Sequence, residues 1–257
     1  MKVCVFGLGE AGSAIAADLA AGGLAVDGYD PAPVATPPDV VRHDDPRAAA
    51  EGAGLVLAIT GAADAREALA QALDAIPAGS VYADLATASA GLKRDLAAQA
   101  AASGLGFADV ALMAPVAGLG LRTPALVSGP AAGKVVALLA PLGMPVEHAG
   151  EEAGAAATRK LLRSIVVKGL TAVVMESMRA AEAAGLGPET WDNIVAQLTA
   201  ADEAFVRRLV DGTPRHAARR VHEMEAAAAL LVELGVEPTM TAATTEHLRG
   251  VAGELPL

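Results

Sequence analysis

Residues 2–13 read Lys-Val-Cys-Val-Phe-Gly-Leu-Gly-Glu-Ala-Gly-Ser, a run with three closely spaced glycines. An apolar, β-type run leads into Gly7, and an alanine-rich helical stretch starts as the glycines end. Gly7 allows a tight turn, Gly9 lets a pyrophosphate approach the backbone, and Gly12 lets the helix pack closely on the strand. The order strand, turn, helix is typical of a dinucleotide-binding loop. We expect the whole loop to contact the cofactor: Gly7, Leu8, Gly9, Glu10, Ala11 and Gly12.

A carboxylate ends the next apolar run. Asp30 lies about 18 residues after Gly12, where it can accept hydrogen bonds from an adenosine ribose and repel a 2′-phosphate. The sequence therefore favours NAD as cofactor, with NADP still possible because Arg42 could fold inward. The proline-rich stretch 31–38 is interpreted as a surface loop beside the ligand rather than a domain linker.

Residues 1–150 alternate short apolar runs with alanine-rich helical stretches, the pattern of a mostly parallel, doubly wound, Rossmann-like sheet. The predicted strands are 2–7, 25–29, 40–42, 55–59, 80–84, 106–111, 125–128 and 145–148, and the predicted crossover helices are 13–21, 63–75, 88–102 and 131–139. Ligands bind at the carboxyl ends of such strands, so Thr60-Gly61 and Asp84-Leu-Ala-Thr87 are expected to complete the cofactor pocket. For Thr60 and Thr87 an ordinary helix N-cap is an equally good interpretation.

After Gly150 the strand signals stop, and residues 151–184 form an almost uninterrupted helical pattern. The sequence thus predicts two domains, a dinucleotide-binding domain 1–150 and an all-α substrate and dimerisation domain 151–257. Further helices are predicted at 189–199, 201–210, 215–235 and 238–252.

The predicted long helix carries a polar stripe on an otherwise apolar surface. Its apolar runs 161–167 and 170–175 are expected to be buried, yet Lys160, Ser164 and Lys168 recur every four residues on one face. Burying such a stripe in a dry core would cost several kcal/mol unless the groups were paired, so it is expected to line a cleft. Spacing alone leaves Lys160 open to a second interpretation, a lysine snorkelling at a helix edge.

Taken together, these motifs resemble the β-hydroxyacid dehydrogenase superfamily, which includes the 3-hydroxyisobutyrate and 6-phosphogluconate dehydrogenases. The resemblance spans nearly the whole chain and rests on the opening segment 5–13, on Asp84–Thr87, and on Gly154 followed by Lys160. It implies that Lys160 is the catalytic acid/base. We further expect Thr87 to orient the substrate oxygen as well as to contact the cofactor.

The chain departs from the family pattern at two places. Ser164 stands where the family has asparagine; it could still hydrogen-bond a substrate oxygen, with shorter reach. Met113 and Ala114 replace the Ser-Gly that cradles a substrate carboxylate, so we expect a more apolar substrate pocket. These features resemble a shorter, largely uncharacterised phosphogluconate-dehydrogenase-like branch. The family's late Lys-Asp pair falls on His222-Glu223; His222 is a candidate substrate contact, and a solvated helix face is the alternative.

Composition limits the classes of function. The chain has 257 residues, 53% hydrophobic and only 2% aromatic, so its core must be built from Ala, Val and Leu. A formal net charge of −11 without a local basic run argues against a nucleic-acid partner. The lone Cys4 is expected to be a small buried hydrophobe, and no metal site is expected. Because the chain opens directly on a strand and its apolar runs are short, we expect a cytoplasmic protein without a membrane span.

The sequence therefore predicts an NAD(P)-dependent oxidoreductase that moves hydride between the nicotinamide and a small hydroxy acid or carbonyl substrate. To act as a base, the amine of Lys160 must lose its proton near neutral pH through desolvation or a neighbouring cation, for which Lys168 and Arg163 are candidates. The alternatives are an imine reductase-like enzyme and a dinucleotide-binding sensor without turnover. Apolar surface on the long helix predicts a homodimer.

Overall fold

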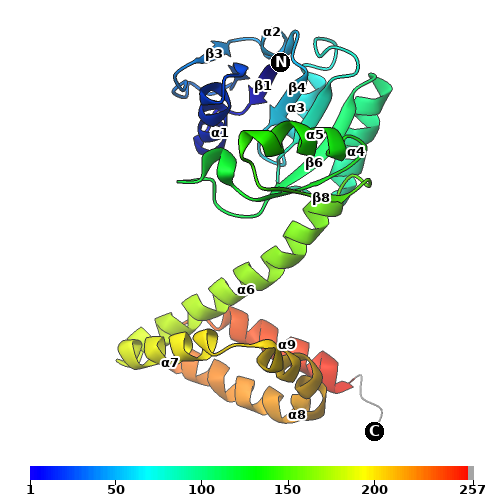
Figure 1. Ribbon diagram of the computed structural model, residues 1–257. Coiled ribbons are helices and arrows are strands. Elements are labelled where there is room, and N and C mark those ends of the chain that lie inside the picture. The colour runs from blue at the N-terminus through cyan, green and yellow to red at the C-terminus, as the bar shows by residue number, and fades with distance from the viewer. Residues whose placement is uncertain (254–257) are drawn as a thin grey trace. The chain divides into compact units, whose positions relative to one another are not determined.

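The computed structural model describes residues 1–253, which divide into two compact units, 1–163 and 164 onward (Figure 1). The first unit holds the sheet and the beginning of the long helix α6, and the second unit holds helices alone. The predicted division into domains 1–150 and 151–257 stays a prediction, because compactness does not show which segments fold independently.

One eight-stranded sheet forms the centre of the first unit, in the order β3-β2-β1-β4-β5-β6-β7-β8. Its strands are β1 (Lys2–Phe6), β2 (Ala25–Tyr29), β3 (Val40–His43), β4 (Leu55–Ala58), β5 (Val81–Asp84), β6 (Gly106–Leu112), β7 (Ala125–Ser128) and β8 (Val146–Gly150). Neighbouring strands run parallel except for β6 and β7, which pair antiparallel. Every predicted strand is present, and the predicted fold class, a mostly parallel Rossmann-like sheet followed by an all-α region, is confirmed.

Helices cover both faces of the sheet, because alternate residues of each strand point to opposite sides. On β1, Val3 and Val5 face a core cluster that includes Ile15 of α1, whereas Cys4 and Phe6 face a second cluster on the other side. The helices are α1 (Glu10–Ala21), α2 (Pro46–Ala50), α3 (Ala65–Ala70), α4 (Ala90–Ala102) and α5 (Ala132–Leu139), with short 3-10 turns η1 (Gly120–Arg122) and η2 (Ala140–Leu142). Cys4 is fully buried, as predicted, and burial raises the pKa of its thiol.

Two details of the predicted helices in the first unit are wrong. Helix α3 is much shorter than the predicted 63–75, because residues 71–76 after it form turns. The one-and-a-half-turn helix α2 was not predicted; the Asp45 side chain caps it by accepting a hydrogen bond from the Arg47 N–H at 2.9 Å, and Pro46 starts it.

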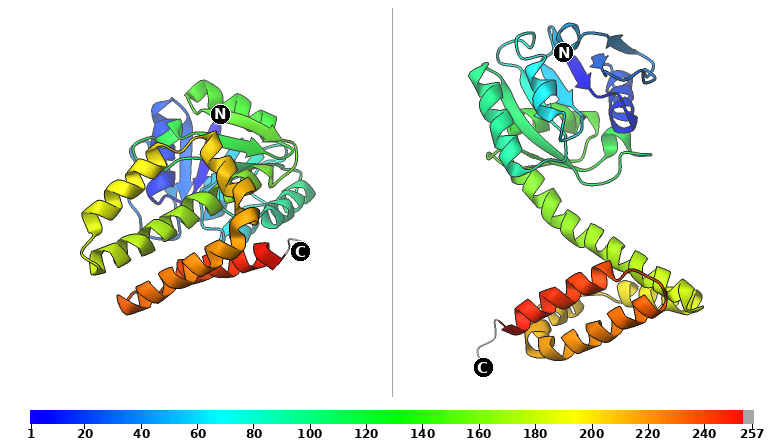
Figure 2. Two further views of the ribbon diagram at one scale, coloured as in Figure 1. Left: turned by 90° about the horizontal axis from the view of Figure 1, so that it is seen from below. Right: turned by 180° about the vertical axis from the view of Figure 1, so that it is seen from behind.

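The second unit consists of most of α6 (Ala155–Ala183) together with α7 (Gly187–Thr199), α8 (Glu203–Glu233) and α9 (Thr239–Gly253). Figure 2 shows α8 and α9 side by side as a helical pair. The prediction of two separate helices at 201–210 and 215–235 is wrong: a single helix α8 runs through Pro214. A proline removes one backbone hydrogen bond, and here the helix continues on both sides of it.

The expected burial of the apolar runs on α6 is also wrong for the single chain. Ile165 and Val166 are each 69% exposed, and Leu162 is 60% exposed. On the polar stripe, Lys160 and Ser164 are half-buried and Lys168 is exposed. The long helix therefore presents apolar side chains that nothing in residues 1–253 covers.

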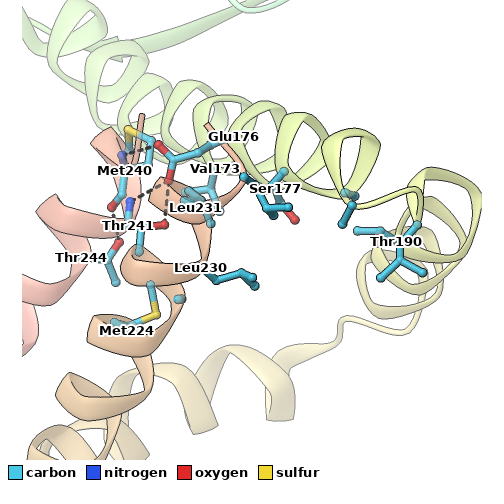
Figure 3. Close-up of a pocket in the computed structure, with 16 residues that line it drawn as sticks. Val173, Glu176, Ser177, Thr190, Met224, Leu230, Leu231, Met240, Thr241 and Thr244 are labelled. Atoms are coloured by element: carbon cyan, nitrogen blue, oxygen red, sulfur yellow. Dashed lines mark hydrogen bonds between the residues drawn. The ribbon is translucent and has the colours of Figure 1, made fainter. Parts of the chain in front are cut away.

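The Glu176 side chain of α6 holds the start of α9 in the second unit (Figure 3). Its carboxylate accepts hydrogen bonds from the Met240 N–H at 2.7 Å, the Thr241 N–H at 2.8 Å and the Thr241 hydroxyl at 2.7 Å. These N–H groups belong to the first turn of α9 and have no acceptor within the helix, so a carboxylate from a neighbouring helix caps them. Burial alone raises the pKa of Glu176, but the hydrogen bonds from Thr241 and Met240 outweigh it and leave the pKa below its ordinary value.

This cap predicts a pH-dependent loss of stability in Glu176→Gln. At pH 7 we expect the free energy of unfolding of the variant to be about 1 kcal/mol lower than that of the wild type, because charge-assisted hydrogen bonds become neutral ones. The folded-state pKa is depressed, so the contribution is fully present above the unfolded-state pKa and is lost as the pH falls through the folded-state pKa. Urea unfolding at pH 7 and at acidic pH measures both. Glu182→Gln, at an exposed position on the same helix, is the control. If Glu176→Gln and the wild type differed equally in free energy of unfolding at the two pH values, the prediction would be contradicted.

Candidate functional site

The glycine loop after β1 has the geometry that its sequence predicts. Gly7 has a φ of +87°, and a Cβ there would lie 2.3 Å from the Ile59 carbonyl oxygen. A Cβ on Gly12 would lie 1.7 Å from the Gly7 carbonyl oxygen, whereas a Cβ on Gly9 would meet no atom within 4 Å. Gly7 and Gly12 are thus required for the turn and for helix packing, while Gly9 faces open space at the start of α1. The first N–H groups of α1 have no acceptor within the helix and can bind an anion.

Asp30 is attached to this loop at the end of β2. Its Oδ2 accepts a hydrogen bond from the Leu8 N–H at 2.7 Å, and its Oδ1 accepts one from the Ala32 N–H at 2.8 Å. The Leu8 side chain is buried under Gly28, where a Cβ would approach its methyl groups to 3.0 Å. The carboxylate therefore has a fixed position beside the glycine loop.

Arg42 of β3 folds inward, as the sequence allowed. Its Nη2 donates to the carbonyl oxygens of Asp30 at 3.0 Å and Ala32 at 2.6 Å, and its Nη1 donates to the Val34 carbonyl oxygen. Arg42 thereby holds the proline-rich loop against the end of β2.

A cleft of about 490 Å³ lies at the carboxyl ends of β1, β2 and β4. Among the predicted cofactor residues, Gly7, Gly9, Asp30 and Thr60 line it. Leu8 and Gly12 are buried beneath the loop, and Glu10 and Ala11 open the first turn of α1. Three carboxylates, those of Asp30, Asp64 and Glu67, are among its lining residues, and within residues 1–253 no lysine or arginine lines it. A cleft with this shape and position fits an adenosine half of a dinucleotide.

The first turns of α6 lie against the same edge of the sheet. Gly154 has a φ of +97°, and a Cβ there would lie 2.8 Å from the Cα of Ala90, the first residue of α4. Thr87, which is exposed, precedes Ala90 by three residues, and Lys160 follows Gly154 in the second turn of α6. The glycine of the Gly-x5-Lys pattern is thus explained by close contact between two helix starts.

The predicted substrate loop meets α6 one turn beyond Lys160. Met113 follows β6, and its N–H donates to the Pro124 carbonyl oxygen at 2.7 Å. Its own carbonyl oxygen accepts a hydrogen bond from Nη1 of Arg163. Lys160 precedes Arg163 by three residues, so the two side chains start from neighbouring positions on the surface of α6. Ser164 follows on the same helix face, one turn after Lys160.

His222 lies in the second unit, on α8. Its side chain is 82% exposed, and its Nδ1 lies 3.2 Å from Oε2 of Glu225, while Glu223 pairs with Arg219 at 3.0 Å. Pairs of this kind are typical of a solvated helix face. A substrate role for His222 stays a prediction.

A buried charge cluster that was not predicted from the sequence joins α4 to β5 and β6. Nζ of Lys93 on α4 lies 2.7 Å from Oδ2 of Asp84, 2.9 Å from the Asp84 carbonyl oxygen and 3.0 Å from Oδ1 of Asp109. All three side chains are at most 1% exposed. Burial raises the pKa of Asp84, and the neighbouring Lys93 opposes this rise in part. The prediction that Asp84 lines the cofactor pocket is therefore wrong: it ends β5 facing inward, paired with a lysine.

A periodic signal for Lys93 was present in the sequence. Lys93, Leu96 and Ala100 all belong to the buried face of α4, at the spacing of an amphipathic helix. A lysine on that face needs a buried partner, and the aspartates at the end of β5 and in the middle of β6 provide it.

Two family matches cover most of the chain. Residues 2–132 match the family described as the NAD binding domain of 6-phosphogluconate dehydrogenase, and this segment holds the glycine loop, Asp30 and the cleft. The chain belongs to this family. Residues 181–251 match a domain of unknown function, DUF1932. The family and the fold confirm the predicted membership in the β-hydroxyacid dehydrogenase superfamily and a dinucleotide cofactor of the NAD(P) type.

Solved structures share the fold over the whole chain. A conserved hypothetical protein from Sinorhizobium meliloti is 28% identical, with a TM-score of 0.63, and the match covers 100% of this chain and 91% of that one. A reductive aminase from Aspergillus terreus, in complex with NADPH4, cyclohexanone and allyl amine, is 19% identical with a TM-score of 0.80, covering 98% and 94%. An imine reductase from Myxococcus stipitatus, in complex with NADP+, is 18% identical with a TM-score of 0.82 and the same coverage.

No curated protein sequence matches this chain. Across residues 1–253, no helix combines the length and the hydropathy that crossing a membrane requires.

Proposed function

We propose that the protein is an NAD(P)-dependent oxidoreductase that interconverts a small hydroxy acid or alcohol and its carbonyl form, with Lys160 as the general acid/base. The contact between Arg163 and the carbonyl oxygen of Met113 is the observation that carries this proposal, because it joins α6 to the predicted substrate loop three residues after Lys160. The dinucleotide, when bound, supplies the hydride acceptor or donor at its nicotinamide C4.

The residues of this chain have separate roles in the proposed reaction. During oxidation the amine of Lys160 takes the hydroxyl proton as the carbinol carbon gives up its hydride; during reduction the protonated amine returns a proton to the oxygen. Thr87 and Ser164 orient that oxygen through their hydroxyl groups. Met113 and Ala114 form a more apolar wall than a Ser-Gly pair would. The glycine loop, Asp30 and Thr60 hold the dinucleotide.

The acidic cleft supports a preference for NADH over NADPH. In the proposed binding mode the Asp30 carboxylate would repel the 2′-phosphate of NADPH. Arg42 does not offset this charge, because its Nη1 and Nη2 groups donate to backbone carbonyl oxygens. We expect Asp30→Ser to reduce the NADH:NADPH affinity ratio about tenfold or more, about 1.4 kcal/mol. Fluorescence titration of both cofactors measures it. Asp44→Asn, at an exposed acid outside the cleft, is the control. An unchanged affinity ratio in Asp30→Ser would show that Asp30 does not set the preference for NADH.

Imine reduction is the second candidate, favoured by the similarity to solved imine reductases and a reductive aminase over almost the entire chain. NADH and NADPH consumption with a panel of 2-keto acids, aldehydes and cyclic imines separates the two reactions. Turnover of the carbonyl compounds supports the proposal, and turnover of imines alone would replace it with the second candidate. Tight NADH binding without any turnover would indicate a dinucleotide sensor.

A homodimer is proposed as the functional assembly, with the exposed face of α6 between the two copies. Ile165 and Val166 are exposed in the single chain, and such large apolar patches mark interaction sites in soluble proteins. Sedimentation at micromolar concentration should give twice the mass of 25.5 kDa. Ile165→Asp should give a monomer, while Val41→Asp, at an exposed valine of the first unit, should not. A wild-type monomer would overturn this assembly.

A further inference from the structure

The start of α6 is held by side chains of the sheet. The Ala156 N–H donates to the Ser128 hydroxyl oxygen at 2.9 Å, and the Ala157 N–H donates to Oδ2 of Asp109 at 2.8 Å. These N–H groups lie in the first helical turn and have no acceptor within the helix. A hydroxyl from β7 and a carboxylate from β6 thus cap α6, and both are fully buried.

Lys93 fixes the carboxylate that makes this cap. Its ammonium group lies 3.0 Å from Oδ1 of Asp109, the oxygen that does not bind the helix, and 2.7 Å from Oδ2 of Asp84. The Ser128 hydroxyl lies 3.3 Å from Oδ2 of Asp109. Both oxygens of Asp109 therefore have defined contacts, and the carboxylate cannot rotate without losing the ion pair or a helix hydrogen bond.

We propose that Ser128 and Asp109, held by Lys93, are positioning residues for Lys160: together they set where the first turn of α6 begins on the sheet, and Lys160 lies one turn later on the same rigid helix. This proposal rests on the function proposed above for Lys160. Asp109, Ser128 and Lys93 are fully buried, so the network acts through the helix and touches neither substrate nor cofactor. A displacement of about 1 Å at a catalytic group can lower turnover by about a hundredfold. A cap that sets the position of Lys160 would therefore affect turnover.

Ser128 provides the mildest test, because its replacements keep the buried charges. Ser128→Ala deletes the acceptor for the Ala156 N–H; Ser128→Thr keeps the hydroxyl and adds a methyl group to a buried site. Ser80→Ala is the matched control, because Ser80 is a buried serine at the amino end of β5. All proteins are studied as full chains at a temperature where each is folded.

Two measurements report position without a substrate. The first is amide hydrogen exchange in the segment 155–160, and the second is the pH profile of Lys160 acetylation by acetic anhydride, followed by mass spectrometry. In Ser128→Ala we expect exchange to rise about tenfold, equivalent to a loss of about 1.4 kcal/mol of local protection, and the acetylation profile to shift from that of the wild type. Ser128→Thr and Ser80→Ala should keep the wild-type profile even where the melting temperature falls.

The outcomes separate the positioning role from the proposed chemistry. If acetylation and exchange in Ser128→Ala follow those of Ser80→Ala, or if the profiles merely track stability across the variants, the positioning role is overturned whatever the turnover. If the profile shifts as expected but the wild type turns over no substrate of the panel, the positioning of Lys160 stands and its catalytic role fails. With an active wild type, kcat of Ser128→Ala should fall about tenfold or more with less than a twofold change in NADH affinity.

Discussion

Lys160→Met is expected to lower turnover by about 10²- to 10⁴-fold while leaving NADH binding unchanged. The reason is chemical: methionine keeps the length and helix propensity of the side chain but cannot exchange a proton with the substrate oxygen. The glycine loop, Asp30 and the cleft that we propose to bind the dinucleotide lie outside α6, so the cofactor affinity has no reason to change. Steady-state kinetics with the best substrate of the panel and NADH fluorescence titration measure the two quantities.

Arg159→Met is the matched control for this variant, because Arg159 is the adjacent cation on α6 and is exposed. It should retain turnover within about threefold, a difference below 1 kcal/mol. Wild-type turnover in Lys160→Met would withdraw the acid/base assignment. A large increase in the NADH dissociation constant would instead assign the amine to cofactor binding.

Lys93→Met is expected to cause the largest loss of stability of any single substitution considered for this chain. It removes the only cation within 3.0 Å of the Asp84 and Asp109 carboxylates among residues 1–253, and leaving a buried charge without its partner costs about 3–5 kcal/mol. The loss should be greater at pH 8 than at pH 5. Burial raises the pKa of Asp84, so in the variant the folded state takes up a proton more readily than the unfolded state as the pH falls, and its stability recovers.

Urea unfolding at pH 5 and pH 8 measures this loss, with Lys134→Met, an exposed lysine on α5, as the control. Should Lys93→Met be too unstable to purify, the double variant Lys93→Met/Asp84→Asn removes one carboxylate charge along with the ammonium and should regain part of the stability. Equal stability of Lys93→Met and Lys134→Met would show that the ion pair contributes nothing.

The architecture of the first unit and the position of the predicted cofactor loop follow from local patterns in the sequence. Strands buried on both faces, such as β1 and β4, are continuous apolar runs, and the less buried strands β2, β3 and β8 were visible as short runs bounded by turn residues. Gly7 is required by its left-handed backbone and Gly12 by its close contact with Gly7, both local constraints, which is why their spacing carried the information. Local patterns were less reliable at Pro214, where packing of α8 against α9 favours one continuous helix over a break.

The contacts between polar groups from distant segments depend on how the whole chain folds. Lys93, Asp84, Asp109 and Ser128 come from four separate elements, and each looks ordinary in its own segment. Their pairing depends on the strand order and on the antiparallel pairing of β6 with β7, which bring residues from distant segments together. The sequence pattern likewise showed that α6 carries many apolar side chains. It did not show whether other parts of this chain cover them, and in the structure several are exposed. A sequence encodes local conformational preference and burial tendency, whereas the identity of a buried partner is set by long-range geometry.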